Sequence, residues 1–426
     1  MSRTFSSLKV ANYRRYAIGS LVSNIGTWMQ RVAQDWLVLQ LTHGSGSALG
    51  ITTGLQFLPM LLFGLWGGVA SDRFAKRRLL VLTQSLMGML SLVLGLLDLS
   101  GTVRVWQVYV LAFLLGSVTA VDNPARQSFV VEMVGRSEVT NAVGLNSASF
   151  NGARVVGPAL AGFLIVLVGT GPLFLLNAAS FAAVLVALWR MDPTTLRSAP
   201  RARRSPGQLR EGLRYVANRP DLVAILTVVG FVGTFGLNFQ MTTALMATQV
   251  FGRGAGAYGM LGSIMAVGSL AGALLGARRQ RPRLRLLLGS AIAFGALEIV
   301  SGLMPGYFWF ALSLVPVGVS SLTFITAANS TMQLAVDPKM RGRVMALYMM
   351  IFMGGTPLGA PLVGWLAEVA GARWSLLSGG IVSLVAAVGA GLVLARVKGL
   401  RLRARLRPRP RLVVMEAQIV STVQQG

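Results

Sequence analysis

Long apolar runs separated by short polar connections fill this chain. Uninterrupted stretches without Asp, Glu, Lys or Arg include 79–97, 105–121, 155–189 and 374–395. About 20 apolar residues in a helix cross the ~30 Å hydrocarbon core of a bilayer. The longest runs exceed one crossing, and breaks rich in glycine or proline, such as 42–47 and 169–172, divide them. The pattern predicts an all-α polytopic membrane protein.

The spacing of the runs predicts twelve membrane-spanning helices. They lie near 13–41, 47–71, 79–99, 105–131, 140–168, 172–190, 221–248, 256–277, 284–303, 307–333, 343–370 and 374–395. One long polar connection separates six helices from six. We therefore expect an N-terminal bundle at 1–190, a cytoplasmic linker at 191–220, a C-terminal bundle at 221–395 and a basic cytoplasmic tail at 396–426.

Part of the linker and the tail could each contact the membrane surface. QLREGLRYVA places Leu209, Leu213 and Val216 on one face of a short helix, which either lies on the inner membrane surface or is an ordinary linker helix. The arginines of 396–411 could lie against anionic lipid, or they could be a topological tail without a ligand.

Composition supports a membrane protein and indicates that the net positive charge reflects membrane topology. Of 426 residues, 54% are hydrophobic and 12% charged, and the mean hydropathy is +0.65. A net charge of +26 would indicate nucleic acid in a soluble chain. Here Lys and Arg gather in alternate connections, at 3–15, 73–78, 190–219, 278–285, 339–343 and 396–411. By the positive-inside rule both termini are cytoplasmic, in a cell (plasma or inner) membrane, and no nucleic-acid partner is expected.

The chain offers little for catalysis or metal binding. It contains no cysteine and a single histidine, His43. We expect no disulfide, no metal site, no cofactor and no enzymatic activity, because no nucleophile–base or metal-ligand constellation is visible.

Residues 68–80, GVASDRFAKRRLL, resemble the signature loop between the second and third helices of the major facilitator superfamily. The resemblance implies a cytoplasmic gate. In this gate Gly68 would permit close helix packing, Asp72 would contact Lys76 one helical turn later, and Glu132 would bond with Arg73. A plain basic loop would explain the lysine and arginines but not the Asp-Arg pair behind a glycine. The gate residues expected are Gly68, Asp72, Arg73, Lys76, Arg77 and Glu132.

The fifth predicted helix resembles the antiporter motif of drug exporters in the same superfamily. Its small residues and one proline permit close packing and a kink. The matching positions are Gly144, Gly157, Pro158 and Gly162. Proton antiporters of this kind usually carry an arginine early in the fourth helix, where this chain has Ala112. That departure weakens any proton relay taken over from them.

Over nearly its whole length the chain is most similar to the branch that holds the enterobactin exporter and macrolide efflux proteins. The supporting segments are RVAQDWLVLQLTHGSGSALG, DNPARQSFVVEMV, NAVGLN, RVVGPALAG and EGLRYV. The resemblance implies two parallel six-helix halves, and four glycines of the first half recur 202 residues later, from Gly152/Gly354 to Gly169/Gly371. It also implies that the first, fourth, seventh and tenth helices line a central cavity.

Ionisable residues at membrane depth are costly and usually face a cavity or a partner. Arg31 and Asp35 are four residues apart, as are Asp122 and Arg126, so each pair can meet on its own helix. We expect Asp35 to carry protons with Arg31 as its partner, although a fixed structural pair is the alternative. Asp122 and Arg126 are either coupling groups or a solvated helix end. Arg154 could draw an anionic group or hold Asp122.

Aromatic and amide side chains on the expected cavity helices suit a bulky amphiphilic substrate, although such stripes are more often packing. The candidates are Trp28, Gln34, Trp36, Phe235, Asn238, Phe239, Phe324 and Asn329.

The leading hypothesis is a proton-coupled exporter of bulky amphiphilic small molecules (a drug, macrolide or siderophore) that works by alternating access. The proton gradient is the expected energy source, and the expected form is a monomer with anionic lipid at its inner face. The alternatives are uptake, lipid flipping and a non-transporting membrane receptor.

Overall fold

The computed structural model describes residues 3–135, 137–196, 208–277, 284–338, 340–397, 400–405 and 411–416. The first half comprises the short helix η1 (Arg3–Lys9) and the helices α1 (Ala11–Leu41), α2 (Gly46–Arg73), α3 (Lys76–Leu99), α4 (Val105–Val134), α5 (Val139–Val168) and α6 (Gly171–Trp189). A short turn, η2 (Pro193–Thr195), begins the connection to the second half. The predicted linker residues 197–207 lie outside the described part.

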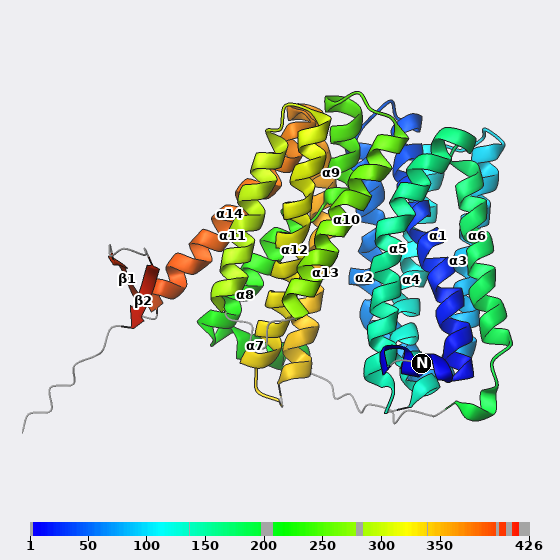
Figure 1. Cartoon of the computed structure of the whole chain (residues 1–426), viewed down its shortest axis with the longest axis horizontal. Helices are drawn as coiled ribbons and strands as arrows, with labels where there is room; N and C mark the ends of the chain where they lie inside the picture. Colours follow the sequence, from blue (N-terminus) through cyan, green and yellow to red (C-terminus); the bar gives the residue numbers. More distant parts are fainter. Residues whose placement is uncertain are drawn as a thin grey trace, which may run out of the picture.

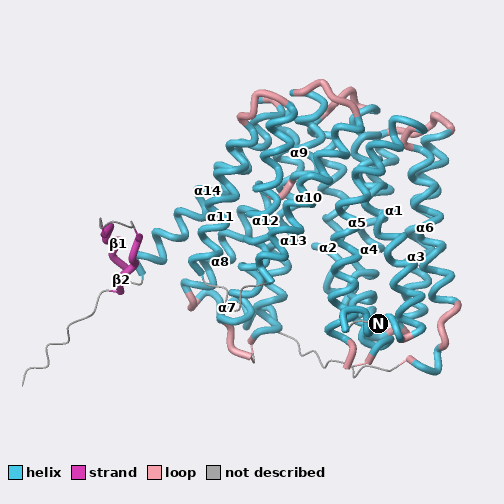
Figure 2. The backbone as a smooth tube through the Cα atoms, in the orientation of Figure 1, coloured by secondary structure: helices cyan, strands magenta, loops and turns pink. Residues whose placement is uncertain are grey.

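The second half begins at the linker helix α7 (Gln208–Ala217). It continues with α8 (Pro220–Phe231), η3 (Val232–Gly236), α9 (Phe239–Leu245), η4 (Met246–Val250), α10 (Ala255–Ala277), α11 (Leu284–Gly302), α12 (Tyr307–Ala335), α13 (Arg341–Ala370) and α14 (Ala372–Val397). Two short strands follow, β1 (Leu400–Arg405) and β2 (Arg411–Glu416), which pair antiparallel with Leu400 opposite Glu416. Figure 2 shows this ribbon in magenta beyond the end of α14, apart from the helices.

The described residues contain eleven helical spans long and apolar enough to cross a membrane. The twelfth helix of the bundle, α1, is 31 residues long and packs against α5 and α6 (Figure 1). It falls short of the apolar composition of the others because it carries Gln30, Arg31, Gln34 and Asp35 in its middle. The predicted all-α membrane fold with two six-helix halves is confirmed.

The seventh span is not the single regular helix that the sequence predicts. Pro220–Val250 is one span made of α8, η3, α9 and η4. In it η3 and η4 are π-helical turns, and the helix is interrupted at Leu237–Asn238. Asn238 offsets part of the break, because its Nδ2 donates to Thr234 O at 2.7 Å. Local π turns inside α-helices are frequent at functional sites. This break brings Asn238 and Gln240 to the space between the halves.

The two halves pack tightly at one end only. We call the end that holds η1 and the α2–α3 connection the N-terminal end (bottom of Figure 1), and the other the distal end. Toward the distal end α5 packs on α10, where a Cβ at Gly162 would lie 2.9 Å from Ala255 O. Toward the N-terminal end of the same helix, a Cβ at Gly144 or Gly152 would meet nothing within 4 Å.

The contact between α2 and α13 is likewise close only toward the distal end. A Cβ at Gly54 would lie 3.2 Å from Pro357 O, and one at Gly354 would lie 2.9 Å from Leu61 Cδ1. Farther along α2, a Cβ at Gly64 would meet only Met60 of its own helix. Glycines therefore let the halves touch in the distal part of α2, and that contact ends before the N-terminal end.

The linker helix α7 is attached to the second half. Arg343 forms an ion pair with Glu211, and Tyr215 OH donates to Asp337 Oδ2 at 3.0 Å. Of the predicted apolar face, Val216 is buried and Leu213 is 56% exposed. Contact of this helix with lipid stays a prediction.

Candidate functional site

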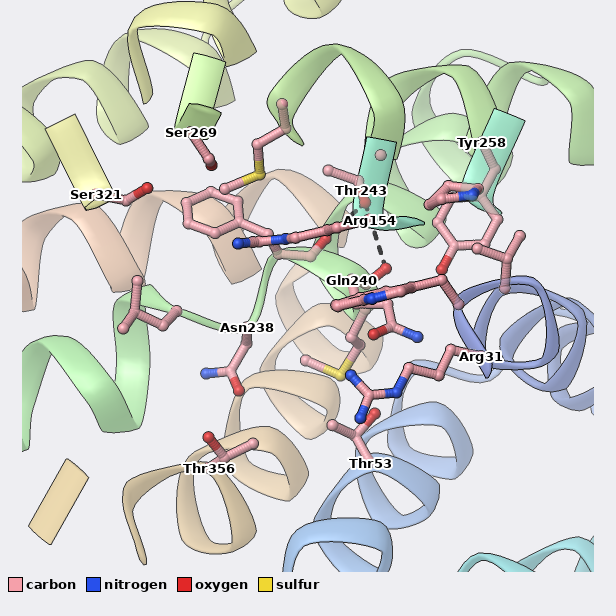
Figure 3. Close-up of a pocket in the computed structure, with 18 of the residues that line it drawn as sticks. Arg31, Thr53, Arg154, Asn238, Gln240, Thr243, Tyr258, Ser269, Ser321 and Thr356 are labelled. Atoms are coloured by element: carbon pink, nitrogen blue, oxygen red, sulfur yellow. Dashed lines mark hydrogen bonds between the residues drawn. The ribbon is translucent and has the colours of Figure 1, made fainter. Parts of the chain in front are cut away.

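A cavity of about 250 Å³ lies between the halves, toward the distal end of the molecule. The first half lines it with Trp28, Arg31, Val32, Thr53, Phe57, Arg154 and Pro158. The second half lines it chiefly with Leu237–Met241, Thr243, Tyr258, Met265, Ser269, Ser321, Leu322, Ile325 and Thr356. We call this space the central cavity. Figure 3 shows its polar side chains and the two arginines that extend into it.

Trp28 holds both arginines of the central cavity. The Arg31 guanidinium carbon lies 4.7 Å from the centroid of the Trp28 ring, and that of Arg154 lies 5.7 Å from it. Phe57 adds a second ring beside Arg31, at 5.8 Å. A guanidinium within ~6 Å of an aromatic ring is attracted by the ring quadrupole. The aromatic residues therefore orient the two cations without neutralising them.

Asp35 lies behind the wall of the central cavity and is bonded to the opposite half. Its side chain is on α1, and Oδ2 accepts hydrogen bonds from Gln240 Nε2 at 2.6 Å and from Tyr258 OH at 2.7 Å. The residue is 3% exposed. Gln240 and Tyr258 also line the central cavity. The two side chains that donate to Asp35 are therefore also within reach of a molecule in the cavity.

Arg31 and Asp35 do not form the expected direct ion pair in this conformation, although their charges attract each other over a longer distance. In the described part of the chain the ion pairs are Lys76–Glu132, Arg126–Asp122, Arg219–Asp221 and Arg343–Glu211. Helical spacing permits Arg31 to reach Asp35, but two donors from the other half take the carboxylate and two aromatic rings take the guanidinium. Tertiary partners override the local pairing rule here.

A second cavity, of about 380 Å³, lies within the first half, and Arg31 lines this one too. Asp122 and Arg126 line it and form the ion pair that their spacing predicts, with Arg126 Nη2 3.0 Å from Asp122 Oδ2. Thr83 and Gln84 of α3 donate to the other carboxylate oxygen at 2.7 and 2.8 Å. Because Asp122 is 1% exposed, the alternative of a solvated helix end is wrong. Arg154 does not hold Asp122.

The predicted aromatic and amide residues divide among several places. Trp28, Asn238 and Phe239 line the central cavity and Gln34 lines the second. Trp36 lines a separate hollow at the distal end with Gln40 and Asp98.

Three of the cavity predictions are wrong for this conformation. Phe324 is fully buried in the core, and Ser321, Leu322 and Ile325 face the cavity in its place, because successive helical residues point ~100° apart. Asn329 instead accepts a hydrogen bond from Gln333 Nε2 at 2.7 Å. Phe235 packs against the core, and its carbonyl accepts from Asn238.

Sequence reasoning missed Tyr258, Thr53 and Phe57. Tyr258 stands alone among glycines and alanines in AGAYGMLG at the start of α10, and a single large polar side chain among small residues is a usable signal. Thr53 and Phe57 are four residues apart on α2, a helix not expected at the cavity.

The gate residues are arranged differently from the expected pairing. Lys76 Nζ contacts Glu132 Oε1 at 2.5 Å, so Glu132 bonds with Lys76 and not with Arg73. Arg77 donates to the backbone carbonyls of Leu188 and Trp189 at the end of α6. Neither Asp72 nor Arg73 has a polar partner among the described residues.

Close packing of α2 on α4 occurs at Gly67, one residue before the expected Gly68. A Cβ at Gly67 would lie 2.9 Å from the carbonyl carbon of Ala120. Gly68 itself is partly exposed.

In α5, Gly157 packs on α1, where a Cβ would lie 3.2 Å from Ile25 O, and Pro158 lines the central cavity. Gly162 packs on α10. Gly144 makes no such contact, so its expected packing role is not used in this conformation.

Comparison with known proteins fits this architecture. The profile of the family described as transmembrane secretion effector matches residues 2–422. The staphyloferrin A transporter of Staphylococcus aureus is 25% identical over 82% of this chain and 87% of its own length. Macrolide efflux protein A of Streptococcus pyogenes is 24% identical, with 90% and 96% covered.

The multidrug efflux pump Tap of Mycolicibacterium fortuitum is 28% identical, over 84% of this chain and 90% of its own. A crystal structure of a bacterial homologue of the human lysosomal transporter Spinster superposes with a TM-score of 0.68 at 16% identity, covering 92% of this chain and 98% of that one. That likeness concerns the fold. The relatives are transporters, and the chain belongs to the transmembrane secretion effector family of the major facilitator superfamily.

Proposed function

We propose that this transporter is a proton-coupled exporter of bulky amphiphilic small molecules, that it works by alternating access, and that Asp35 is its coupling residue. The observation that carries the proposal is the pair of hydrogen bonds that Asp35 of α1 accepts from Gln240 and Tyr258 of the other half. Rocking the halves apart at the distal end must break these bonds. We call this three-residue contact the latch.

The direction of the cycle follows from the charge distribution. Basic connections such as 73–78 lie at the N-terminal end, so we assign that end to the cytoplasm. The halves are then packed on the outside and apart on the inside, which is an inward-facing conformation. An ionised Asp35 favours this conformation, because each hydrogen bond to a charged group contributes about 1.5–3 kcal/mol.

Either a proton or a substrate can release the latch. Protonation removes the negative charge that strengthens both bonds to Asp35. A substrate acceptor group in the central cavity can take the same donors, because Gln240 and Tyr258 line it. A carrier whose distal end opens for either ligand can exchange one for the other. Asp35 would bind a proton outside, where the latch is open, and release it inside, where the latch forms.

The lining of the two cavities supports an amphiphilic substrate. Trp28, Phe57 and Phe239 supply apolar surface, and amides and hydroxyls lie between them. Sites for drug-sized ligands measure about 300–1,000 Å³. The central cavity, about 250 Å³ in this conformation, is slightly smaller than that range, and the second, about 380 Å³, lies within it; Arg31 lines both. Export is supported by relatives that are a macrolide efflux protein and a multidrug efflux pump.

The test uses the full chain in proteoliposomes that contain a pH-sensitive dye, with erythromycin, tetracycline and staphyloferrin A as trial substrates. An imposed pH gradient should drive substrate movement, and substrate should in turn move protons. Flux that is indifferent to the gradient would remove proton coupling. Net flux toward the face that bears the N-terminus would support uptake in place of export.

A further inference from the structure

The two arginines of the central cavity have no direct ion pair among the described residues. Asp35 attracts Arg31 from a longer distance, so one carboxylate stands against two guanidinium groups, and this excess of positive charge restricts the substrate. Tyr258, Arg31 and Arg154 are the ionisable residues that line the central cavity, and no carboxylate lines it in the described part of the chain. Neither arginine belongs to any of the ion pairs between described residues, and Asp35 is bonded elsewhere. A cation in such a place is costly unless a partner neutralises it.

Unsatisfied polar atoms accompany the unpaired charge. Arg31 Nε is enclosed and has no hydrogen-bond partner among the residues that the structure describes, and the same holds for Asn238 Oδ1 and Ser269 Oγ, whose residues line the same cavity. Buried polar groups in folded proteins are nearly always paired, so each such group here calls for a specific explanation. Figure 3 shows Arg31, Arg154, Asn238 and Ser269 around one space. A ligand that accepts from a guanidinium satisfies the strongest of these groups.

We propose that the central cavity binds an organic carboxylate, with the anionic group between Arg31 and Arg154 and the apolar body against Trp28 and Phe57. This deepens and rests on the proposed function, since it names the charge class of the exported molecule. A carboxylate matches the forked donors of a guanidinium, and charge-assisted bonds of this kind are stronger than neutral ones. A cationic amphiphile has no complementary group in the lining and is repelled by both arginines.

An anionic substrate also fits the latch. Its carboxylate oxygens are strong acceptors, so they can compete with Asp35 for Gln240 and Tyr258. With Asp35 ionised and one carboxylate bound, the two arginines are balanced, which lowers the cost of enclosing the site during the outward step. After release, a proton on Asp35 leaves the site cationic, and the membrane potential then favours its return to the inside.

The test is a binding titration on the full chain in neutral-lipid nanodiscs, by calorimetry, with three probes of matched shape: naphthoate, naphthamide and naphthylmethylamine. We expect naphthoate to bind roughly tenfold or more tighter than naphthamide, and the protonated amine to bind most weakly. The double variant Arg31→Gln/Arg154→Gln should bind naphthoate and naphthamide equally. Arg253→Gln, which removes an exposed arginine that stacks on Tyr307 outside the cavity, should keep the wild-type preference.

Equal binding of naphthoate and naphthamide to the wild type would overturn the proposal, as would absence of naphthoate binding. Retention of the preference in the double variant would do the same. Each single variant, Arg31→Gln and Arg154→Gln, should lose part of the preference, so the proposal stays testable if the double variant does not fold. No gradient is present in the titration. Failure of gradient-driven flux with a retained naphthoate preference would therefore remove proton coupling and leave this assignment standing.

Discussion

Two buried carboxylates on cavity-facing helices, Asp35 and Asp122, have opposite kinds of partner. Asp122 is satisfied within the first half, by Arg126 on its own helix and by Thr83 and Gln84 of α3. Asp35 receives its two hydrogen bonds from the second half. A rigid-body rotation of the halves leaves the surroundings of Asp122 intact and removes those of Asp35.

This difference separates a structural carboxylate from one that can couple a proton to movement. A proton-coupling group needs a proton affinity that differs between the two conformations, because a ligand can shift an equilibrium only through its differential affinity. In the proposed rocking of the two halves, the partners of Asp35 change with the conformation, whereas those of Asp122 do not. Both residues are almost fully buried, so burial alone does not distinguish them.

The largest expected effect is on coupling in Asp35→Asn. The amide is close in shape to a protonated carboxylate and cannot release a proton, so gradient-driven flux should fall to the uncoupled level. Substrate-induced proton movement in proteoliposomes measures this. The matched control is Asp122→Asn, in which whatever flux remains should still respond to the gradient; equal loss of coupling in both variants would erase the distinction between them.

The next effect is on stability, where we expect substitution of Asp122 to have a larger effect than substitution of Asp35. Asp122→Ala leaves Arg126 as an uncompensated charge in the protein interior, which should cost about 3–5 kcal/mol of stability. The thermal unfolding midpoint of the purified protein should drop clearly. Asp35→Ala leaves two neutral donors unpaired and removes a longer-range attraction on Arg31 but breaks no direct ion pair, so it should lower the midpoint less. A larger drop for Asp35→Ala would show that Asp35 is the main structural carboxylate.

A smaller effect is expected at the contacts between the halves. Gly162→Val adds a side chain where a Cβ would lie 3.1 Å from Gly259 Cα, and it should disfavour the packed distal end. Gly144→Val, on the same helix, meets nothing within 4 Å and should leave the packed form in place. The chain has no native cysteine, so spin labels at paired introduced cysteines report the separation without background. Equal shifts in the two variants would contradict one-ended packing.

The smallest effect is expected at the gate. Lys76→Gln replaces the ion pair with Glu132, in which both side chains are 13% exposed, by at most a neutral hydrogen bond, and should lower stability by about 1–2 kcal/mol. Asp72→Asn removes no polar contact in this conformation and should leave the unfolding midpoint unchanged. A loss in Asp72→Asn that exceeds the loss in Lys76→Gln would indicate a partner that forms only in another conformation.

Local patterns predicted the helices and the positions of the charges well. A membrane helix is recognised from residues that are close together in the sequence, and the four-residue spacing of Asp122 and Arg126 was sufficient to predict their ion pair. The partners of Asp35 could not be found this way, because Gln240 and Tyr258 are 205 and 223 residues away in the chain. The sequence showed Arg31 one turn from Asp35, but not the rings of Trp28 and Phe57 that hold it. The prediction that Phe324 lines the cavity was wrong because neighbouring residues of α12 point in different directions, so a shift of one position along the helix separates a cavity-lining side chain from a core side chain.

The most direct test of the latch is the pH dependence of the distance between the halves at the distal end. Spin labels at Thr102→Cys and Leu303→Cys, both exposed residues beyond α3 and α11, report it. If ionised Asp35 holds the halves together, lowering the pH should shift the wild type toward longer distances, and Asp35→Asn should show the longer distances at every pH. A wild-type distribution that does not change with pH, or an unchanged pH response in Asp35→Asn, would contradict the role of Asp35 as the coupling residue.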